Sequence, residues 1–333
     1  MRIRKSISFS WQIILIIILM SCKSGDKHPL LPSVTGKPGA LAIVIDKSEW
    51  DSEVGDSIRN VFEQPFQVIP QYEPIFDAFS IPHSAFNNVM LPQRNIIIVN
   101  IDSKYDMSKI TVQRDVYADS QIIIDMFAKN DSAFIKLFDE NQKKIIGLLE
   151  DVERKRLQDH YKFNLDEKIY KDLRSKRNLS LLVPKGFKIS IDTTNFVWLY
   201  QDIETITLGI LIYEYNYTDT NTFTLNYLVN KRNQFVNKYV EGEVDGSYMT
   251  TEREFGPFLT QYMLNGTRYV AEMRGLWKME NGISMGGPFI SITTLDEKRN
   301  RIVTVEGFVF AAGKDKRNYV RQVDAIVLSL EIL

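Results

Sequence analysis

Cysteine and histidine are scarce in this chain of 333 residues: Cys22 is the only cysteine, and there are three histidines. A single thiol excludes an intramolecular disulfide, so no such cross-link supports the fold. His28 lies close to the N-terminus, and the two remaining histidines are too few for a histidine-rich zinc site. No metal ion or other cofactor is therefore predicted.

The common catalytic motifs are also missing. The sequence contains no HExxH helix, no glycine-rich phosphate loop and no GxSxG elbow. His83 precedes Ser84 in a proline-rich loop and is the remaining candidate for a catalytic histidine, whereas His160 is predicted on a solvated helix face. Glu252 and Glu272 would suit a glycosidase, but 42 acidic residues produce such pairs by chance. The sequence thus favours a protein that is not an enzyme.

An excess of basic charge is absent too. The chain has 41 basic and 42 acidic residues and an isoelectric point near 6.4. Without the first 22 residues, 38 basic residues remain against the 42 acidic ones. Nucleic acid attracts basic surfaces, so it is not a predicted partner.

The longest apolar run lies at the N-terminus. Three basic residues at positions 2 to 5 are followed by an apolar run over 13–20 and then by Ser21 and Cys22. This pattern is typical of a secretory signal, predicted here over 1–21. A transmembrane helix needs about 20 apolar residues, so a membrane-spanning anchor is the weaker interpretation of this run.

Leu19-Met20-Ser21-Cys22 resembles the bacterial lipobox, in which the cysteine is acylated and becomes the new N-terminus. The resemblance implies lipidation of Cys22 and attachment to a membrane through acyl chains. The alternative is ordinary cleavage that leaves a free thiol. Residues 22–39 are rich in Gly, Pro, Ser and Lys, which predicts a flexible tether before a fold that starts at Ala40.

Residues 40–178 are predicted to form an N-terminal α/β domain. Continuous apolar runs over 40–45 and 94–102 indicate buried strands, with further strands at 76–81 and 120–127. The spacing of apolar residues predicts a helix near 54–62. A helical bridge is expected over 131–178, where the charged run at 151–156 is interpreted as a solvated helix face and a partner-docking helix is the alternative.

Residues 179–333 are predicted to form a second domain, an antiparallel sheet with flanking helices. Strands are expected at 179–183, 188–192, 196–200, 209–215, 267–279, 289–295 and 301–310, and helices at 225–239 and 319–330. The predicted fold class is therefore α+β. It is similar to small sheet-and-helix envelope domains of the Mog1/PsbP type, an analogy of fold alone.

One segment of the strand at 267–279 is a candidate binding surface. Arg274 and Trp277 lie close in sequence to Gly286, Gly287 and Pro288, and arginine and tryptophan often carry binding energy at interfaces. The alternative, which the pattern favours, is that Trp277 belongs to the core and the Gly-Gly-Pro segment is a turn.

Several segments together resemble an uncharacterised lipoprotein family of Bacteroidota: GKPGALAIVID at 36–46, RNIIIVNID at 94–102, SYMTTE at 247–252, MRGLWKMENG at 273–282, MGGPF at 285–289 and KDKRNYVRQVDAI at 314–326. The family bears a domain-of-unknown-function label. The resemblance implies a Gram-negative envelope lipoprotein and supplies no activity, cofactor or catalytic residue. An acidic signal after the cysteine marks surface display in that phylum, and Asp26 alone favours the periplasmic face of the outer membrane.

Three functions remain open at this point. The favoured one is a non-catalytic envelope protein that binds a protein partner or assists an assembly. The second is a carrier or chaperone for an apolar ligand such as lipid, which requires a deep, dry cavity in the C-terminal half. The third is a hydrolase of envelope glycan or peptide, which requires two carboxylates, or His83 with Ser84 and an acid, to converge in a cleft.

Overall fold

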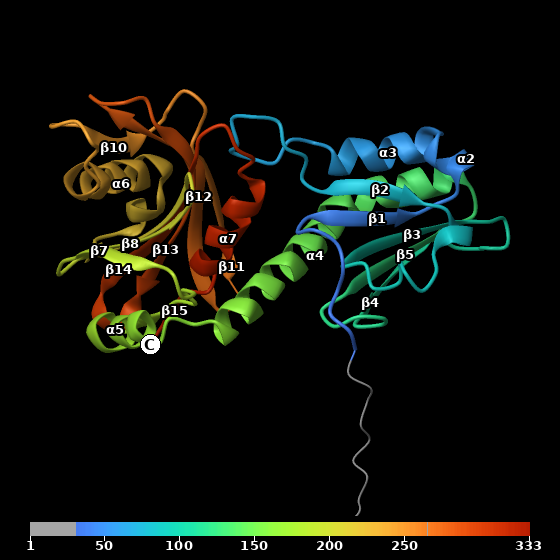
Figure 1. Cartoon of the computed structure of the whole chain (residues 1–333), viewed down its shortest axis with the longest axis horizontal. Coiled ribbons are helices and arrows are strands. Elements are labelled where there is room, and N and C mark those ends of the chain that lie inside the picture. Colours follow the sequence, from blue (N-terminus) through green and yellow to red (C-terminus); the bar gives the residue numbers. More distant parts are fainter. Residues whose placement is uncertain (1–30, 265) are drawn as a thin grey trace, which may run out of the picture.

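The computed structural model describes residues 31–333 apart from residue 265. Two lobes, each built on its own β-sheet, are joined by the long helix α4 (Asp131–Phe163) (Figure 1). This mixed architecture confirms the predicted α+β class. The predicted signal peptide, Cys22 and the first part of the predicted tether lie outside the described residues.

The N-terminal lobe contains a five-stranded sheet in the order β2-β1-β3-β5-β4. All its strands run parallel except β4, which pairs antiparallel with β5. Its central strands are continuous apolar runs because both faces of a parallel sheet are covered. The strands are β1 (Ala40–Val44), β2 (Asp77–Ile81), β3 (Asn95–Ile101), β4 (Lys109–Arg114) and β5 (Ile122–Ala128).

Helices cover one face of this sheet. They are α2 (Lys47–Trp50), α3 (Glu53–Phe62) and the first half of α4. Ser52 caps α3, because its Oγ accepts a hydrogen bond from the backbone N–H of Val54 at 3.2 Å. The other face is covered by the segment around the 3₁₀-helix η1 (His83–Ala85) and by Val116.

The C-terminal lobe contains an eight-stranded antiparallel sheet in the order β10-β12-β13-β14-β9-β8-β7, with β11 also paired to β12. β12 is long enough for β11 and β10 to share its outer edge, along residues 268–274 and 277–280 respectively. The strands are β7 (Lys188–Asp192), β8 (Phe196–Ile203), β9 (Ile206–Asn216), β10 (Tyr248–Thr251), β11 (Phe258–Leu264), β12 (Arg268–Glu280), β13 (Gly286–Asp296) and β14 (Arg301–Ala311).

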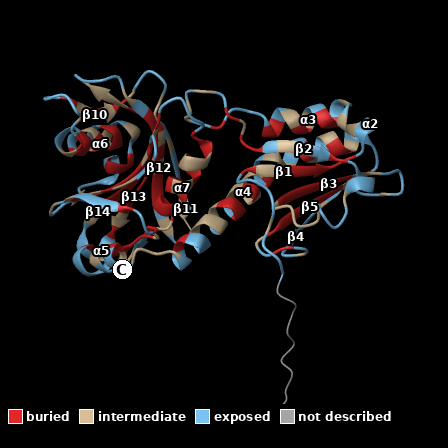
Figure 2. Ribbon diagram, viewed as in Figure 1, coloured by how far each residue is buried: buried red, intermediate tan, exposed pale blue. Residues whose placement is uncertain are grey.

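Apolar clusters fill both faces of this second sheet. One face packs against α6 (Leu225–Tyr239), which follows the 3₁₀-helix η2 (Thr220–Phe223). The other packs against α5 (Glu167–Arg177), α7 (Arg317–Val327) and the short strands β6 (Leu179–Ser180) and β15 (Glu331–Ile332). The 3₁₀-helix η3 (Glu297–Arg299) joins β13 to β14. Figure 2 shows the central strands of both sheets as buried.

Helix α4 belongs to both lobes. Its 33 residues span about 50 Å, and Asn130 caps its first turn by accepting a hydrogen bond from Ala133 N–H at 3.0 Å. Phe134 and Phe138 pack in the N-terminal core, whereas Tyr161 packs in the C-terminal core. The predicted helical bridge is therefore one continuous helix followed by the shorter α5.

The charged run at 151–156 is not one solvated face, which corrects the sequence interpretation. Glu153 is 3% exposed and accepts hydrogen bonds from Asn95 Nδ2 at 2.7 Å and from Arg156 Nη1 at 2.9 Å. Burial is the main reason that the pKa of Arg156 falls to about 10. These groups fasten α4 to the amino end of β3, a contact that helical periodicity does not reveal.

The loop at 63–76, between α3 and β2, fastens the N-terminal lobe to α7. The Glu73 carboxylate accepts hydrogen bonds from the backbone N–H groups of Lys316 at 2.6 Å and Arg317 at 2.8 Å. A residue from one lobe thus caps a helix of the other. Arg317 in turn donates to both oxygens of Asp77 at 3.0 and 2.6 Å, so the interface is held by directed polar contacts.

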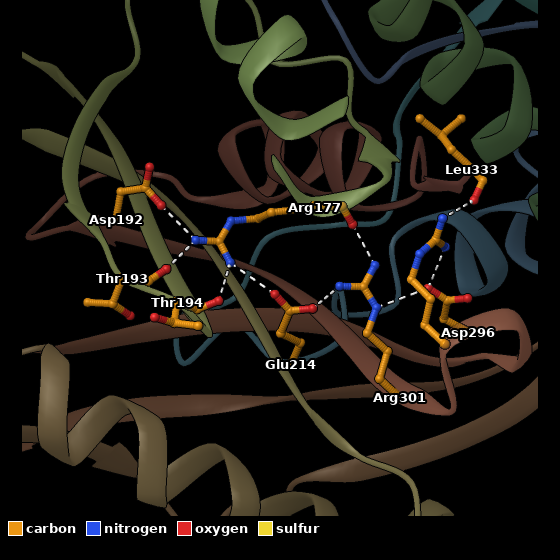
Figure 3. Close-up of polar contacts among 9 residues, drawn as sticks. Arg177, Asp192, Thr193, Thr194, Glu214, Asp296, Arg301 and Leu333 are labelled. Carbon is orange, nitrogen blue, oxygen red and sulfur yellow. Dashed lines mark hydrogen bonds and ion pairs between the residues drawn. The ribbon is translucent and has the colours of Figure 1, made fainter. Parts of the chain in front are cut away.

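A second polar network joins α5, β9, β14 and the C-terminal residue within the C-terminal lobe (Figure 3). Arg177 on α5 donates to Glu214 on β9 at 3.0 Å, and Glu214 also accepts from Arg301 on β14. Arg301 donates at 3.0 Å to Asp296, which binds Arg299, and Arg299 reaches the backbone oxygen of Leu333 at 3.0 Å. The guanidinium groups here are occupied by protein acceptors, which indicates a structural role.

The last part of the predicted tether is held against the N-terminal lobe. Thr35 N–H donates to the Pro92 oxygen at 2.8 Å, and the Thr35 oxygen accepts from Arg94 N–H at 3.1 Å. Asp119 N–H donates to the Pro32 oxygen at 2.8 Å. Residues 32–35 therefore line the amino ends of β3 and β5, although their composition predicted a flexible spacer.

Candidate ligand-binding cavity between the lobes

A cavity of about 470 Å³ lies where α4, α7, β12 and the loop at 63–76 meet. Its volume falls within the range of about 300–1,000 Å³ that small-molecule sites occupy, and such sites favour domain interfaces. Both lobes contribute to its wall. The lining residues are Gln64, Phe66, Gln67, Ile75, Gln142, Lys143, Ile146, Glu150, Glu153, Arg154, Glu272, Arg274, Arg321 and Asp324.

One wall is a face of α4 that carries Lys143 and Glu150. They are seven residues apart, which places them on the same side of the helix about 10 Å apart along its axis. Within residues 31–333 except 265, neither makes an ion pair shorter than 4.0 Å. Burial raises the pKa of the Glu150 carboxyl, while Arg321, Arg274 and Arg154 oppose that rise. α4 therefore presents to the cavity one exposed ammonium group and one partly buried carboxyl group, and neither has an ion-pair partner within 4.0 Å among the described residues.

The opposite wall is a network around Arg274 on β12. Arg274 Nε donates to Glu272 Oε1 at 2.5 Å, and its Nη2 donates to Asp324 Oδ1 on α7 at 2.8 Å. Tyr262 on β11 donates its hydroxyl to the other oxygen of Glu272 at 2.6 Å. Arg154 on α4 lies 3.9 Å from Asp324 Oδ2. One guanidinium thus organises two carboxylates from different elements.

Burial shifts the acid–base properties of this network. The pKa of the Asp324 carboxyl is raised by burial and by Glu272, against the effect of Arg274. The pKa of Tyr262 is raised by burial and by the adjacent Glu272 carboxylate. Although burial works against the cation, the pKa of Arg274 is raised because Asp324 and Glu272 stabilise its charge. Arg274 therefore stays protonated and holds both acids in place.

Arg321 forms the corner between the two walls. Its Nη2 donates to the Ile75 oxygen at 2.7 Å, and its guanidinium lies 4.6 Å from the ring centre of Phe76 and 5.5 Å from that of Phe66. Burial and the neighbouring Arg317 lower its pKa. Aromatic faces stabilise a cation at this distance, so Arg321 joins the lobes as well as lining the cavity.

The structure separates the two residues of the predicted binding surface. Side chains alternate between the faces of a strand, so Arg274 and Trp277, three residues apart, point to opposite sides of β12. Trp277 is 3% exposed, packs against Phe308 and donates its Nε1–H to the Val309 oxygen at 3.2 Å. Trp277 is thus a core residue, as the favoured interpretation held, and Arg274 alone lies at the cavity.

The segment from Gly286 to Pro288 is not a turn but the start of β13. A side chain at Gly287 would place its Cβ 2.0 Å from the Val309 oxygen. Glycine is therefore required for close approach of two strands rather than for binding a ligand.

The residues that were considered for catalysis do not meet in one site either. Glu252 pairs with Lys278 at 3.2 Å, whereas Glu272 faces Arg274. His83 Nδ1 lies 3.3 Å from Asp46 Oδ1, and both border a separate pocket of about 180 Å³ at the carboxyl ends of β1 and β3. Ser84 is not among the residues that line this pocket. The carboxylates that do line one cavity are Glu150, Glu153, Glu272 and Asp324, which the sequence did not single out as a group.

Two further observations concern the described part of the chain. It contains no group of three or more His, Cys, Asp or Glu side chains arranged to hold a metal ion. Among the same residues, no helix has both the length and the apolar character needed to cross a membrane.

Comparison with known protein families gives two matches. Residues 34–162 match the model of a domain of unknown function (DUF8532), and residues 166–329 match that of another (DUF4837). The boundary between the matches falls at the junction of α4 and α5. No curated protein matches the chain.

Among solved structures, the chain is similar to a protein from Bacteroides thetaiotaomicron VPI-5482, with 12% identity and a TM-score of 0.27 over 47% of this chain and 46% of that one. This chain thus covers about half the length of that relative. It is also similar to the Ran-binding protein Mog1p of Saccharomyces cerevisiae, with 8% identity and a TM-score of 0.31 over 46% of this chain and 90% of that one. Mog1 is the fold type named in the sequence analysis, and the likeness concerns fold alone.

Proposed function

We propose that this protein is a lipid-anchored, non-catalytic binding protein of the bacterial cell envelope that holds a small zwitterionic ligand, of tripeptide size, between its lobes. The observation that carries the proposal is that Lys143 and Glu150 line one wall of a 470 Å³ cavity, and that neither has an ion-pair partner within 4.0 Å among the described residues. A ligand ammonium would neutralise Glu150, and a ligand carboxylate would neutralise Lys143. Three extended residues span about 10 Å, which matches the spacing of these two groups along α4.

The opposite wall supports binding more than catalysis. Asp324 and Glu272 are both hydrogen-bonded to Arg274, and Glu272 also accepts from Tyr262. Groups fixed in this way form a preorganised polar surface against which the ligand backbone can form hydrogen bonds. The charged lining also disfavours an apolar cargo, since burying unpaired charges beside a lipid chain is costly.

The membrane attachment rests on the N-terminal sequence. Cys22 follows a basic start and an apolar run, and the next described segment is held to the N-terminal lobe at residues 32–35. We place the protein at the outer membrane, facing the periplasm, where a protein partner could deliver or receive the ligand. Replacement of Cys22 by Ala is expected to abolish acyl labelling and to release the protein into the soluble fraction; a variant that stays membrane-bound would point to residues 11–20 as the anchor.

Ligand binding can be tested with defined probes on the purified Cys22→Ala chain. Isothermal titration calorimetry with triglycine, which carries one ammonium and one carboxylate, should give measurable binding. Phosphate and spermidine, each with charge of one sign, should bind at least tenfold more weakly. The variants Glu150→Gln and Lys143→Gln should each weaken triglycine binding about tenfold or more, the loss expected for one charged contact.

Lys278→Gln is the matched control. Lys278 lies on the same face of β12 as Arg274, but it pairs with Glu252 and does not line the cavity. It should leave triglycine binding unchanged. Equal binding of triglycine to the parent chain and to Glu150→Gln would contradict the proposal, as would binding of phosphate alone.

A second candidate function, hydrolysis of envelope glycan or peptide, is favoured by one observation. Glu150 and Asp324 line the same cavity, and burial raises the pKa of both carboxyl groups, a property of general acids. Release of soluble fragments from purified peptidoglycan by the parent chain, and not by Glu150→Gln, would support it. If the parent chain releases no fragments, the hydrolase function is contradicted.

A further inference from the structure

Strand β11 is an unusual edge of the C-terminal sheet. It pairs with β12 on one side, and no strand pairs with its other side in the described part of the chain. Its sequence, FLTQYML, has neither a charged residue nor a proline. Phe258 is 61% exposed and Met263 is 52% exposed. A row of unpaired backbone groups with exposed apolar side chains is a template for another strand.

The other edge strands of the two large sheets in the described chain carry protection. β7 begins with Lys188, ends with Asp192 and has a register shift between Ile189 and Ile191. β4 begins and ends with basic residues, β2 begins with an acidic one, and β10 has only four residues. Charges, bulges and short length are the usual means of preventing edge-to-edge pairing. β11 has none of them, which indicates that its edge is covered in the working protein.

We propose that β11 pairs antiparallel with β11 of a second copy of this chain, around a two-fold axis at Gln261. The strand is self-complementary about this residue. Antiparallel pairing places apolar residues opposite apolar ones and polar opposite polar: Phe258 with Leu264, Leu259 with Met263, Thr260 with Tyr262, and Gln261 with itself. A two-fold interface needs such self-complementarity, and a strand evolved for a different partner does not.

The two faces of the sheet also remain matched. Residues directly opposite in an antiparallel pair lie on the same face. Leu259 and Met263 share the face that packs against α6, and Leu259 already contacts the apolar cluster there. Leu264 contacts the cluster on the α7 face. The pairing therefore extends both apolar layers across the axis and joins the two C-terminal sheets into one.

The single native cysteine makes the proposal easy to test by cross-linking. In the Cys22→Ala chain, Gln261→Cys introduces one thiol at the axis, opposite its own copy. Paired strands place such residues about 4.5–5.5 Å apart between Cα atoms, within the range of a disulfide. Mild oxidation should convert most of the protein to a covalent dimer on non-reducing gels.

Met263→Cys is the matched control. It is also exposed, but the two copies of residue 263 lie four residues apart along the strands, about 13 Å, which is too far for a disulfide. Cross-linking should therefore be at least tenfold slower than at residue 261. Equal cross-linking at both positions would indicate random collision and overturn the proposal.

Sedimentation of the chain without added cysteine gives an independent readout. The Cys22→Ala protein should be dimeric at micromolar concentration, and Gln261→Lys should be monomeric, because two lysines would face each other at the axis. The lysine can still donate to the Phe223 oxygen, which Gln261 Nε2 contacts at 2.8 Å, so an unchanged Tm should confirm folding. A parent chain that stays monomeric at all concentrations would overturn the proposal that β11 pairs with its own copy.

Discussion

Two arginine–carboxylate pairs lie on opposite faces of the C-terminal sheet and differ in their access to solvent. Arg232 and Glu306, on the α6 face, are both 0% exposed. Arg274 and Asp324, on the α7 face, border the cavity between the lobes. The comparison shows that burial of charge does not by itself mark a binding site: the site needs a space that reaches the charges.

The sealed pair is satisfied by the protein itself. Arg232 donates to both oxygens of Glu306 at 2.8 and 2.7 Å and to Thr251 Oγ1 at 2.8 Å, and its guanidinium lies 4.0 Å from the ring centre of Phe289. Burial raises the pKa of Glu306, and Arg232 opposes that rise. Such a pair fixes where α6 sits on the sheet and leaves no group to meet a ligand.

The largest effect is expected from breaking the sealed pair. Arg232→Met keeps the side-chain volume but leaves Glu306 unpaired in the core, which should lower the free energy of unfolding by about 3–5 kcal/mol. Urea denaturation measures this loss. The double variant Arg232→Met/Glu306→Leu removes both charges and should regain most of the stability. A double variant as unstable as the single one would mean that packing, not charge, determines the loss.

A smaller effect is expected at the open pair. Arg274→Met leaves Asp324 and Glu272 without their shared donor, but water in the cavity can solvate them, so the loss should be about 1–3 kcal/mol. Triglycine binding should weaken in the same variant. Lys278→Met is the control on the same strand face, and its exposed pair should contribute less than about 1 kcal/mol. Equal losses at Arg274 and Arg232 would remove the distinction between open and sealed pairs.

The smallest effect, of opposite sign, is expected at Glu150. Its pKa is raised in the folded protein, so ionising it costs more in the folded than in the unfolded chain once the pH exceeds its ordinary value. Glu150→Gln removes this cost and should stabilise the protein at pH 7–8, by less than about 1 kcal/mol. Below pH 4 the Glu150 carboxyl is largely protonated in both the folded and the unfolded chain. The difference in Tm between the parent chain and Glu150→Gln should therefore vanish. A stabilisation that is independent of pH would exclude this electrostatic cause.

The central strands and most helices were predictable from local pattern. The apolar runs at 40–45 and 94–102 became β1 and β3, and the alternation at 267–279 became β12. Among the strands of the two large sheets, β4, β10 and β11 were not predicted. All three are edge strands, stabilised by pairing with a neighbour, and such pairing leaves little trace in hydrophobic periodicity.

The cavity was less predictable than the fold, because it depends on contacts between distant segments. Arg274 was selected for its residue type, but its companion Trp277 was not compatible with strand alternation. Glu150 could not be told apart from the other charges of α4, since only the approach of the C-terminal lobe buries it. Asp324 did leave a signal: it is an acid beside the apolar stripe formed by Val320, Val323 and Val327.

The capping of α7 by Glu73 has a consequence for how a ligand would enter. Glu73, Asp77 and Ile75 of one lobe bind the first turns of a helix in the other, and α4 is shared by both cores. Separation of the lobes would remove the Glu73 cap of α7. It would also break the hydrogen bonds from Arg317 to Asp77 and from Arg321 to the Ile75 oxygen. These contacts hold the two lobes in place, so the proposed ligand would bind a cavity whose shape is already set, without domain closure.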